Sequence, residues 1–279
     1  MFRTSPSRLR TPLLALSLAL LAQGCGTLSV QQERDLGEQF ILQIKREVDL
    51  FSERVVVDYV DQIGRLILAN SPPQPFAFEF YVIEDEDINA FAGPGGYIFV
   101  NTGTILKARN VSELAGVIAH EIGHVVERHV AENYNRQRAA GTLHKIGVYA
   151  AAIVGGALAA NAMNLGGGLA AMAVLNTFGR DAEREADEFA VETLVKSGID
   201  PSGIVSFFEL LAREGGPGAP AFLSSHPAPV ERVDNTREQI EDLGPLPGLR
   251  ATDGGRFEII QRRIRLLTRR APRASPDSR

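Results

Sequence analysis

Cysteine and tryptophan are almost missing from this chain: its 279 residues include one cysteine, Cys25, and no tryptophan. A single thiol excludes an internal disulfide and any metal site built from several thiolates. Basic residues are not in excess either, because 29 lysines and arginines stand against 34 aspartates and glutamates, for a net charge of -5. The basic footprint of a nucleic-acid-binding protein is therefore absent. The hydrophobic content of 44% and the length indicate a globular chain of one or two domains.

The first 24 residues indicate a targeting segment rather than part of the fold. Three arginines precede an apolar stretch at residues 13–22, which is too short to span a bilayer comfortably. Residues 21–25 end on the only cysteine and resemble the cleavage region of a bacterial lipoprotein signal. We expect residues 1–24 to be removed and Cys25 to carry a lipid that tethers the protein to a membrane, the alternative being a secreted protein with a free thiol. Gly26 is not the aspartate that typically retains lipoproteins at the inner membrane, so the resemblance favours the outer membrane, facing the periplasm.

A run of strongly apolar residues long enough to cross a membrane is also lacking in the rest of the chain. Residues 146–178 have no charged residue and are rich in alanine and glycine. A transmembrane helix needs about 20 strongly apolar residues, and Asn161 and Asn164 weaken that interpretation. We expect a packed hairpin or a lid over the functional site instead.

Apolar periodicity predicts many helices and a few short strands. Helical spacing covers residues 31–69 with a break near Phe51, and alternating apolar and polar residues predict a strand at 76–83. A second β-rich run at 97–100 follows a glycine-rich bend. Later helices are predicted at 110–135, 181–196, 201–213, from 226 and at 257–267, and the tail 271–279 is expected to be disordered. These elements indicate an α+β fold, mainly α-helical with a small β-sheet, with residues 25–270 as one domain.

The most informative stretch is residues 119–125, where His120 and His124 are four apart and Glu121 follows the first of them. On a helix, positions i and i+4 lie on one face, so both imidazoles can reach one metal ion. Glu121 then lies beside the open coordination position. This is the pattern of a zinc hydrolase helix.

Catalytic zinc needs a third protein ligand and one open position for water. A third histidine six residues after His124 is excluded, because that position is Val130. His129 lies five residues after His124, about 140° further around a continuous helix. We therefore expect His129 to face elsewhere and to have a structural role.

A later acidic helix offers a better third ligand. Glu183 and Asp187 are four apart and share a helix face, whereas Glu185 points away from that face. Glu183 can bind zinc while Asp187 accepts a hydrogen bond from a ligand histidine and fixes its tautomer. These residues could also be no more than the exposed acidic start of a helix, which the helix dipole favours. The preceding helix with its two histidines makes the ligand role the better interpretation.

At this point the chain resembles the membrane-associated zinc metallopeptidases of the CAAX-prenyl-protease and HtpX type. The closer likeness is to their soluble periplasmic branch, which includes BepA and LoiP. The resemblance spans about residues 35–240. It rests on five ordered motifs: Asn89 to Ala92 with Pro94 to Tyr97, Glu113 to Ala115, His120 to His124 with Arg128 and His129, Glu183 to Asp187, and Ser225 to Pro227 with Arg232.

The resemblance implies a gluzincin fold with one zinc ion bound by His120, His124 and Glu183. It also implies that His226 is either a removable fourth ligand or a donor to the oxyanion. Arg232 is implied as a transition-state donor or as a residue that holds the lid. We expect no helical-repeat extension after about residue 270, unlike in BepA.

The expected activity is that of a periplasmic zinc endopeptidase acting on misfolded or misassembled envelope proteins. Glu121 would be the general base. The substrate would lie extended along an edge strand at 97–101, with Asn89, Tyr97, Phe99 and Asn101 as substrate-binding residues. Two alternatives remain open: a zinc-binding chaperone or scaffold lipoprotein with a closed site, and a non-peptidase zinc hydrolase such as an esterase.

Overall fold

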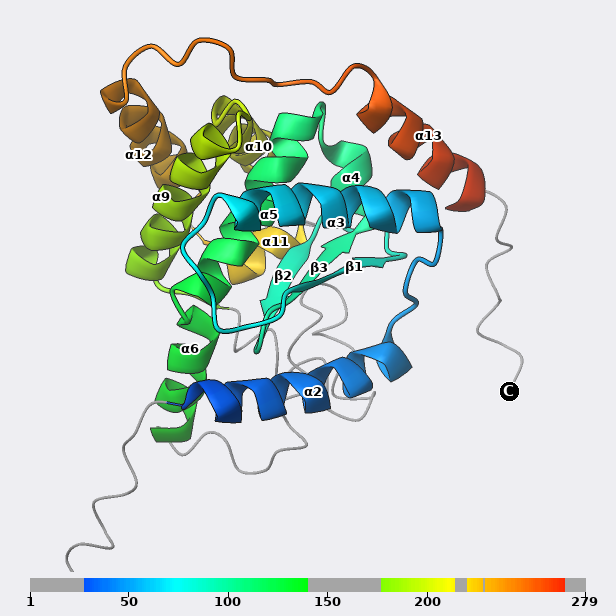
Figure 1. Cartoon of the computed structure of the whole chain (residues 1–279), viewed down its shortest axis with the longest axis vertical. Coiled ribbons are helices and arrows are strands. Elements are labelled where there is room, and N and C mark those ends of the chain that lie inside the picture. The colour runs from blue at the N-terminus through cyan, green and yellow to red at the C-terminus, as the bar shows by residue number, and fades with distance from the viewer. Residues whose placement is uncertain (1–27, 140–176, 214–219, 228, 269–279) are drawn as a thin grey trace, which may run out of the picture.

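A computed structural model describes residues 28–139, 177–213, 220–227 and 229–268 of the chain. Several expectations fall outside the described residues: the signal peptide at 1–24, the lipidated Cys25, all but the last two residues of the 146–178 hairpin, and the tail 271–279. Among the described residues, no helix is both long enough and apolar enough to cross a membrane. The predicted α+β fold is confirmed, because helices surround one three-stranded sheet (Figure 1).

The sheet has the strand order β1-β3-β2. Its central strand β3 (Tyr97–Asn101) runs parallel to β1 (Glu79–Ile83) and antiparallel to β2 (Ala90–Gly93). The prediction that residues 97–101 form an edge strand is therefore wrong. The sequence did not reveal β2 as a strand. With β2 present, β3 is paired on both sides, and β2 takes the edge among the described strands.

The two faces of the sheet are covered by different helices (Figure 1). On one face, α3 (Arg54–Ala69) packs so closely on β1 that a Cβ at Gly64 would lie 2.2 Å from the Phe80 ring. On the other face, α2 (Val30–Glu47) places Phe40 edge-on to Phe99, with ring centroids 5.6 Å apart. Alternation of side chains along β3 explains this division, since residues 97, 99 and 101 face one way and residues 98 and 100 the other.

The helix α5 (Val111–Val126) lies at the centre of the molecule, and all of its residues from Val111 to Val125 are buried. Its start is capped as predicted, because the Asn110 side chain accepts a hydrogen bond of 3.0 Å from the Glu113 N–H. The helices α9 (Arg180–Lys196) and α10 (Ser202–Arg213) make the most extensive contacts with it. In a helix buried on all sides, as α5 is, a polar side chain without a partner is costly.

The remaining helices complete the shell, and two of their boundaries differ from the prediction. The helix predicted at 110–135 is broken, since α5 ends at Val126 and a new helix begins at His129. His226 does not open a helix but follows one as its C-cap. These helices are α4 (Thr102–Lys107), which was not predicted, α6 (His129–Ala139), α11 (Ala221–Ser225), α12 (Pro229–Asp242) and α13 (Arg256–Thr268).

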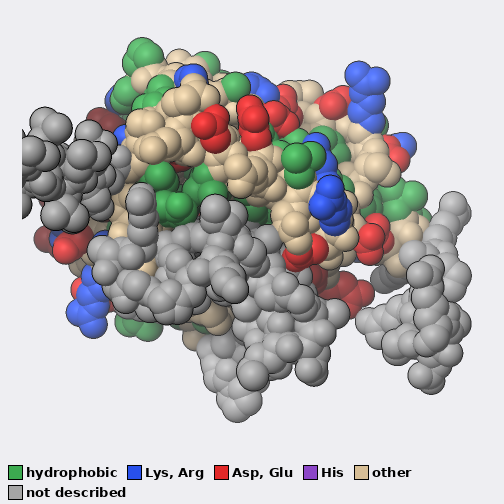
Figure 2. Space-filling view, turned by 90° about the horizontal axis from the view of Figure 1, so that it is seen from below, with side chains coloured by type: hydrophobic (Ala, Val, Ile, Leu, Met, Phe, Trp, Pro, Cys, Tyr) green, Lys and Arg blue, Asp and Glu red, His purple; other side chains and the backbone are tan. Residues whose placement is uncertain are grey.

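The surface seen from below carries interspersed acidic and basic side chains, and no described histidine is visible on it (Figure 2). The four described histidines are at most 3% exposed. Buried histidines without a structural reason are uncommon, so their position deep in the fold indicates a site.

Candidate metal centre

Four buried side chains from three parts of the chain converge on one point. His120 and His124 come from α5, Glu183 from the first turn of α9, and His226 from the end of α11. One ligand atom from each lies within 4.8 Å of the others. The structure thus brings together the pair, the later carboxylate and the histidine that sequence reasoning singled out.

The spacing of these atoms is compatible with one bound zinc ion. His120 Nε2 is 3.0 Å from His124 Nε2 and 3.2 Å from His226 Nδ1, and His226 Nδ1 is 3.0 Å from Glu183 Oε1. The fourth measured edge, from His124 Nε2 to Glu183 Oε1, is 3.5 Å. Ligands about 2.0–2.1 Å from a tetrahedral zinc would lie about 3.3–3.4 Å apart, close to these four distances, while the set as a whole lies within 4.8 Å. Three imidazoles and a carboxylate are also ligand types that zinc prefers.

Close packing of α9 against α5 brings Glu183 to the two histidines. A Cβ at Gly123, between the two ligand histidines, would lie 3.1 Å from the Cα and the carbonyl oxygen of Ala186. A larger residue at position 123 would therefore push α9 away. The glycine within the motif sets the distance between the two helices that carry the ligands.

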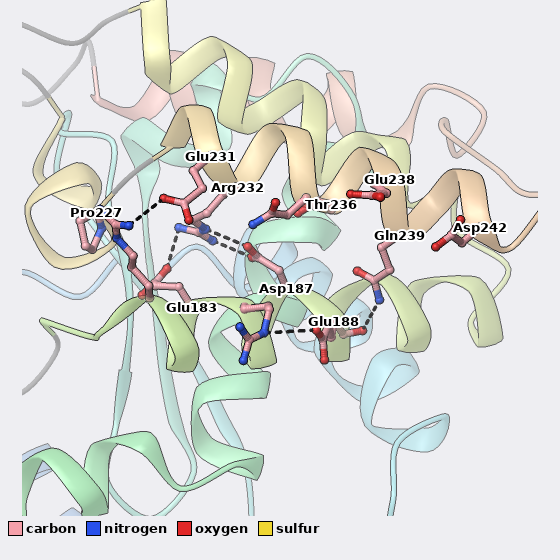
Figure 3. A pocket seen from close by; sticks show the side chains of 13 residues that line it. Glu183, Asp187, Glu188, Pro227, Glu231, Arg232, Thr236, Glu238, Gln239 and Asp242 are labelled. Carbon is pink, nitrogen blue, oxygen red and sulfur yellow. Dashed lines mark hydrogen bonds and ion pairs between the residues drawn. The ribbon is translucent and has the colours of Figure 1, made fainter.

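Arg232 and Asp187 hold the ligands from behind. Asp187 Oδ1 lies 2.8 Å from His120 Nδ1, as the predicted second carboxylate should. The Arg232 guanidinium, from α12, lies 2.6 Å from Glu183 Oε2 and 2.7 Å from Asp187 Oδ1, and it stacks 4.0 Å over Phe208. Figure 3 shows Arg232 between the two carboxylates, at a groove of about 440 Å³ between α9 and α12. The guanidinium of Arg232 is thus already paired with both carboxylates. That Arg232 also donates to a substrate in the transition state stays a prediction.

These charges set the protonation of the site. Burial opposes ionisation of Glu183 and Asp187, but Arg232 and the nearby histidines together outweigh it and lower the pKa of both carboxyl groups. Burial, together with the nearby His120, lowers the pKa of His124 well below its ordinary value. An ionised glutamate and a neutral histidine are the forms that bind zinc.

Glu121 differs from the other acidic groups of the site. It is fully buried, and neither of its carboxylate oxygens has a hydrogen-bond partner. The Nε2 atom of His226 lies 3.4 Å from Glu121 Oε1. Burial raises the pKa of Glu121. A buried carboxylate left without a partner beside a ligand set is suited to accept a proton from a bound molecule.

The predicted substrate-binding residues have other surroundings. Phe99 is fully buried and stacks on Phe91, with centroids 4.8 Å apart, and Tyr97 lies in the same aromatic layer. The Asn101 side chain donates to the Asp87 carbonyl. These three side chains have partners within the fold on the face covered by α2. Asn89 is buried with an unpartnered Oδ1, and its role in substrate binding stays a prediction.

Three contacts of the ligands were missed from the sequence. Phe178 stacks on the His124 ring with centroids 3.8 Å apart, and Phe222 stacks on the His226 ring at 4.3 Å. His129 lies 3.0 Å from His124, ring nitrogen to ring nitrogen, although it was expected to face elsewhere. That expectation assumed a continuous helix, and the break after Val126 removes the assumption. Both phenylalanines come from separate segments, so no spacing along the sequence could have indicated them.

A comparison with known families agrees with this geometry. The model of peptidase family M48 matches residues 58–240, more than half of the chain. The chain belongs to peptidase family M48. The buried site is therefore a zinc metallopeptidase centre, and the match contains all four converging side chains.

Curated relatives extend the likeness beyond the family model. A putative beta-barrel assembly-enhancing protease of Vibrio cholerae is 33% identical over 231 residues, which are 79% of this chain and 46% of that protein. Metalloprotease LoiP of Escherichia coli is 33% identical over 171 residues, 61% of this chain and 65% of LoiP. Metalloprotease YcaL of Escherichia coli is 28% identical over 222 residues, 80% of this chain and 79% of YcaL. This M48 chain spans about half the length of the beta-barrel assembly-enhancing proteases that it matches.

Proposed function

We propose that this M48 chain is a zinc-dependent endopeptidase that cleaves misfolded or misassembled envelope proteins in the bacterial periplasm. The observation that carries the proteolytic part is Glu121, a buried carboxylate with no hydrogen-bond partner beside the ligand set. A purely structural zinc site has no use for such a group. The envelope substrates are supported by relatives named for beta-barrel assembly.

In the proposed reaction, His120, His124 and Glu183 hold the metal. When bound, zinc supplies Lewis-acid chemistry, lowering the pKa of water toward about 7 and polarising a peptide carbonyl. Glu121 accepts a proton from the attacking water and passes it to the leaving amine. Asp187 keeps the proton of His120 on Nδ1, so that Nε2 stays free to bind the metal.

The substrate would add a strand to the sheet at β2. Strand addition needs an unpaired edge, and β3 has none because both of its neighbours are present. The edge closest to the metal helix is β2, which packs against α5. All four residues of β2 are buried, so a substrate reaches this edge only when the covering groups move.

The membrane attachment proposed for the chain is a lipid on Cys25 that places it at the outer membrane, facing the periplasm. Lipid labelling of the wild type and of Cys25→Ser tests it, together with fractionation of the envelope. Incorporation of label into wild type alone, with outer-membrane fractionation, supports the proposal. Equal labelling of both proteins, or none, contradicts it.

Cleavage of casein and of an unfolded outer-membrane protein by the wild type and by Glu121→Gln tests the proteolytic function. We expect Glu121→Gln to lose about 10²–10⁴ in rate, because the general base is removed. Zinc content is measured alongside and should stay unchanged, since Glu121 is not among the converging ligands. Equal proteolysis by both proteins would sink the enzyme proposal.

A second candidate function is a zinc-binding chaperone or scaffold lipoprotein with a closed site. It is favoured by His226, because a fourth protein ligand gives the closed coordination of a structural zinc site. Prevention of outer-membrane protein aggregation separates the two functions. A chaperone keeps this activity in Glu121→Gln, whereas a protease that works by cleavage loses its effect along with its rate.

A further inference from the structure

The two ligand histidines of α5 are supported in different ways. His120 Nδ1 faces the Asp187 carboxylate directly, at 2.8 Å. Among the residues that the structure describes, the partner of His124 Nδ1 is the Nδ1 atom of His129, at 3.0 Å. The other nitrogen of His129, Nε2, lies 3.0 Å from Glu185 Oε2. His129 is 3% exposed and is not among the side chains that converge on the metal.

The proton order in this chain of contacts follows from the metal. His124 presents Nε2 to the other ligands, so in the zinc-bound form its proton is on Nδ1. That proton is donated to His129 Nδ1, which must therefore accept. His129 is then protonated on Nε2 and donates to the Glu185 carboxylate. Every contact has one donor and one acceptor, so the chain fixes the tautomers of both rings.

We propose that His129 and Glu185 are positioning residues for the metal ligand His124. They do for His124 what Asp187 does for His120: they fix the proton on Nδ1, orient the ring and increase the basicity of Nε2. The half-exposed Glu185 supplies the charge at the outer end, and the buried His129 transmits it. The inference rests on the zinc site alone and does not depend on which substrate, if any, is cleaved.

A left-handed residue brings His129 to this place. Arg128 has φ 60° and is the only described non-glycine residue with a positive φ. This conformation costs about 1–2 kcal/mol for a residue with a Cβ. It ends α5 and turns the chain back, so that the next residue faces His124 instead of pointing about 140° away as in a continuous helix.

The Arg128 side chain secures the turn. Its guanidinium donates to the buried Glu33 carboxylate at 2.9 Å and 3.1 Å, and to the Leu28 carbonyl at 2.5 Å. Burial raises the pKa of Glu33, and Arg128 opposes this shift. The start of α2 therefore fixes the bend that presents His129 to the metal ligand.

Metal affinity and the absorption spectrum of the cobalt-substituted protein test the proposal. Glu185→Ala is the main variant, because Glu185 is half exposed and its removal should leave the fold intact. Glu188→Ala is the matched control, since Glu188 lies on the same helix with a side-chain exposure of 55% against 50% for Glu185. We expect Glu185→Ala to weaken zinc binding about 10-fold and to shift the Co²⁺ bands, and Glu188→Ala to change neither.

Two variants of His129 complete the experiment. His129→Phe removes both contacts and should weaken zinc binding at least as much as Glu185→Ala. His129→Asn keeps a polar group near the Nδ1 position and should recover part of the affinity, which a merely space-filling role would not predict. Zinc affinities of Glu185→Ala and His129→Asn within about twofold of wild type, with unchanged Co²⁺ spectra, would overturn the proposal.

Discussion

His226 contacts the ligand set with one ring nitrogen and Glu121 with the other. Its Nδ1 lies 3.0 Å from Glu183 Oε1, and its Nε2 lies 3.4 Å from Glu121 Oε1. One imidazole thus lies between the converging ligand atoms and Glu121. A metal held by four protein side chains has no open position for catalysis. If His226 is the proposed fourth ligand, it would have to leave this position before Glu121 could act on a water molecule.

Replacing His226 by alanine should open the site. If the open state is a minor one of at most about 10%, basal casein cleavage should rise at least about 10-fold. Zinc affinity should fall, because one ligand is lost. If His226 instead donates to the oxyanion, cleavage should drop about 10²–10³-fold. Unchanged cleavage together with unchanged zinc affinity would reject both roles.

Arg232 should stabilise the zinc-free protein more than the zinc-bound one. Arg232→Met leaves Glu183 and Asp187 buried without their cation, which should lower the free energy of unfolding by about 3–5 kcal/mol. Bound zinc compensates the charge of Glu183, so the loss should be smaller in the holo protein. Urea unfolding with and without zinc measures both values.

The control for this variant is Arg237→Met on the same helix. Arg237 forms an exposed pair with Glu209 at 2.7 Å, which should contribute less than about 1 kcal/mol. Arg232→Lys should fall between the two, because lysine keeps the charge but cannot contact both carboxylates in a fork. An equal effect of the two methionine variants would contradict the assigned role.

The local sequence pattern predicted the ligands better than it predicted their surroundings. His120 and His124 could be placed from the periodicity of one helix, and Glu183 with Asp187 from that of another. His129 could not, because its position depends on a left-handed Arg128 that is held by Glu33, about 95 residues earlier in the chain. Helix periodicity contains no information on a bend whose cause is a distant ion pair.

The sheet shows the same limit. Alternating residues predicted the strands at 76–83 and 97–100, but β2 is a short run of small and aromatic residues that is buried throughout. A strand buried on both faces has no alternation to detect. Without β2 the central strand was taken for an edge, and the substrate was expected to lie along it. Strand order depends on pairing between segments, which a single sequence does not show.

The spacing of α5 and α9 should depend on Gly123. Gly123→Val places methyl groups against Ala186 and Phe189, which lie only 3.1 Å and 3.2 Å from an ideal Cβ. Overpacking of this kind should cost about 1–3 kcal/mol and displace Glu183 from the histidines, so zinc affinity should fall as well. Gly179→Ser is the control, since nothing lies within 4 Å of its added Cβ and serine is a good N-cap. Urea unfolding measures the loss of stability, and competition with a zinc chelator measures the zinc affinity. A wild-type zinc affinity in Gly123→Val would show that the spacing of the two helices does not control the ligands.

The ion pair between Arg128 and Glu33 should stabilise the fold more than surface pairs do. Glu33 is 1% exposed, so Glu33→Gln removes the charge that Arg128 needs while leaving a group of the same size. We expect the free energy of unfolding to fall by about 1–3 kcal/mol. Asp61→Asn, which breaks an exposed pair with Arg65, should cost less than about 1 kcal/mol. Because the bend after α5 depends on Arg128, Glu33→Gln should also increase hydrogen exchange at the start of α6 while the start of α9 stays protected. Uniform exchange across both helices would mean that the pair stabilises the whole fold without securing this turn.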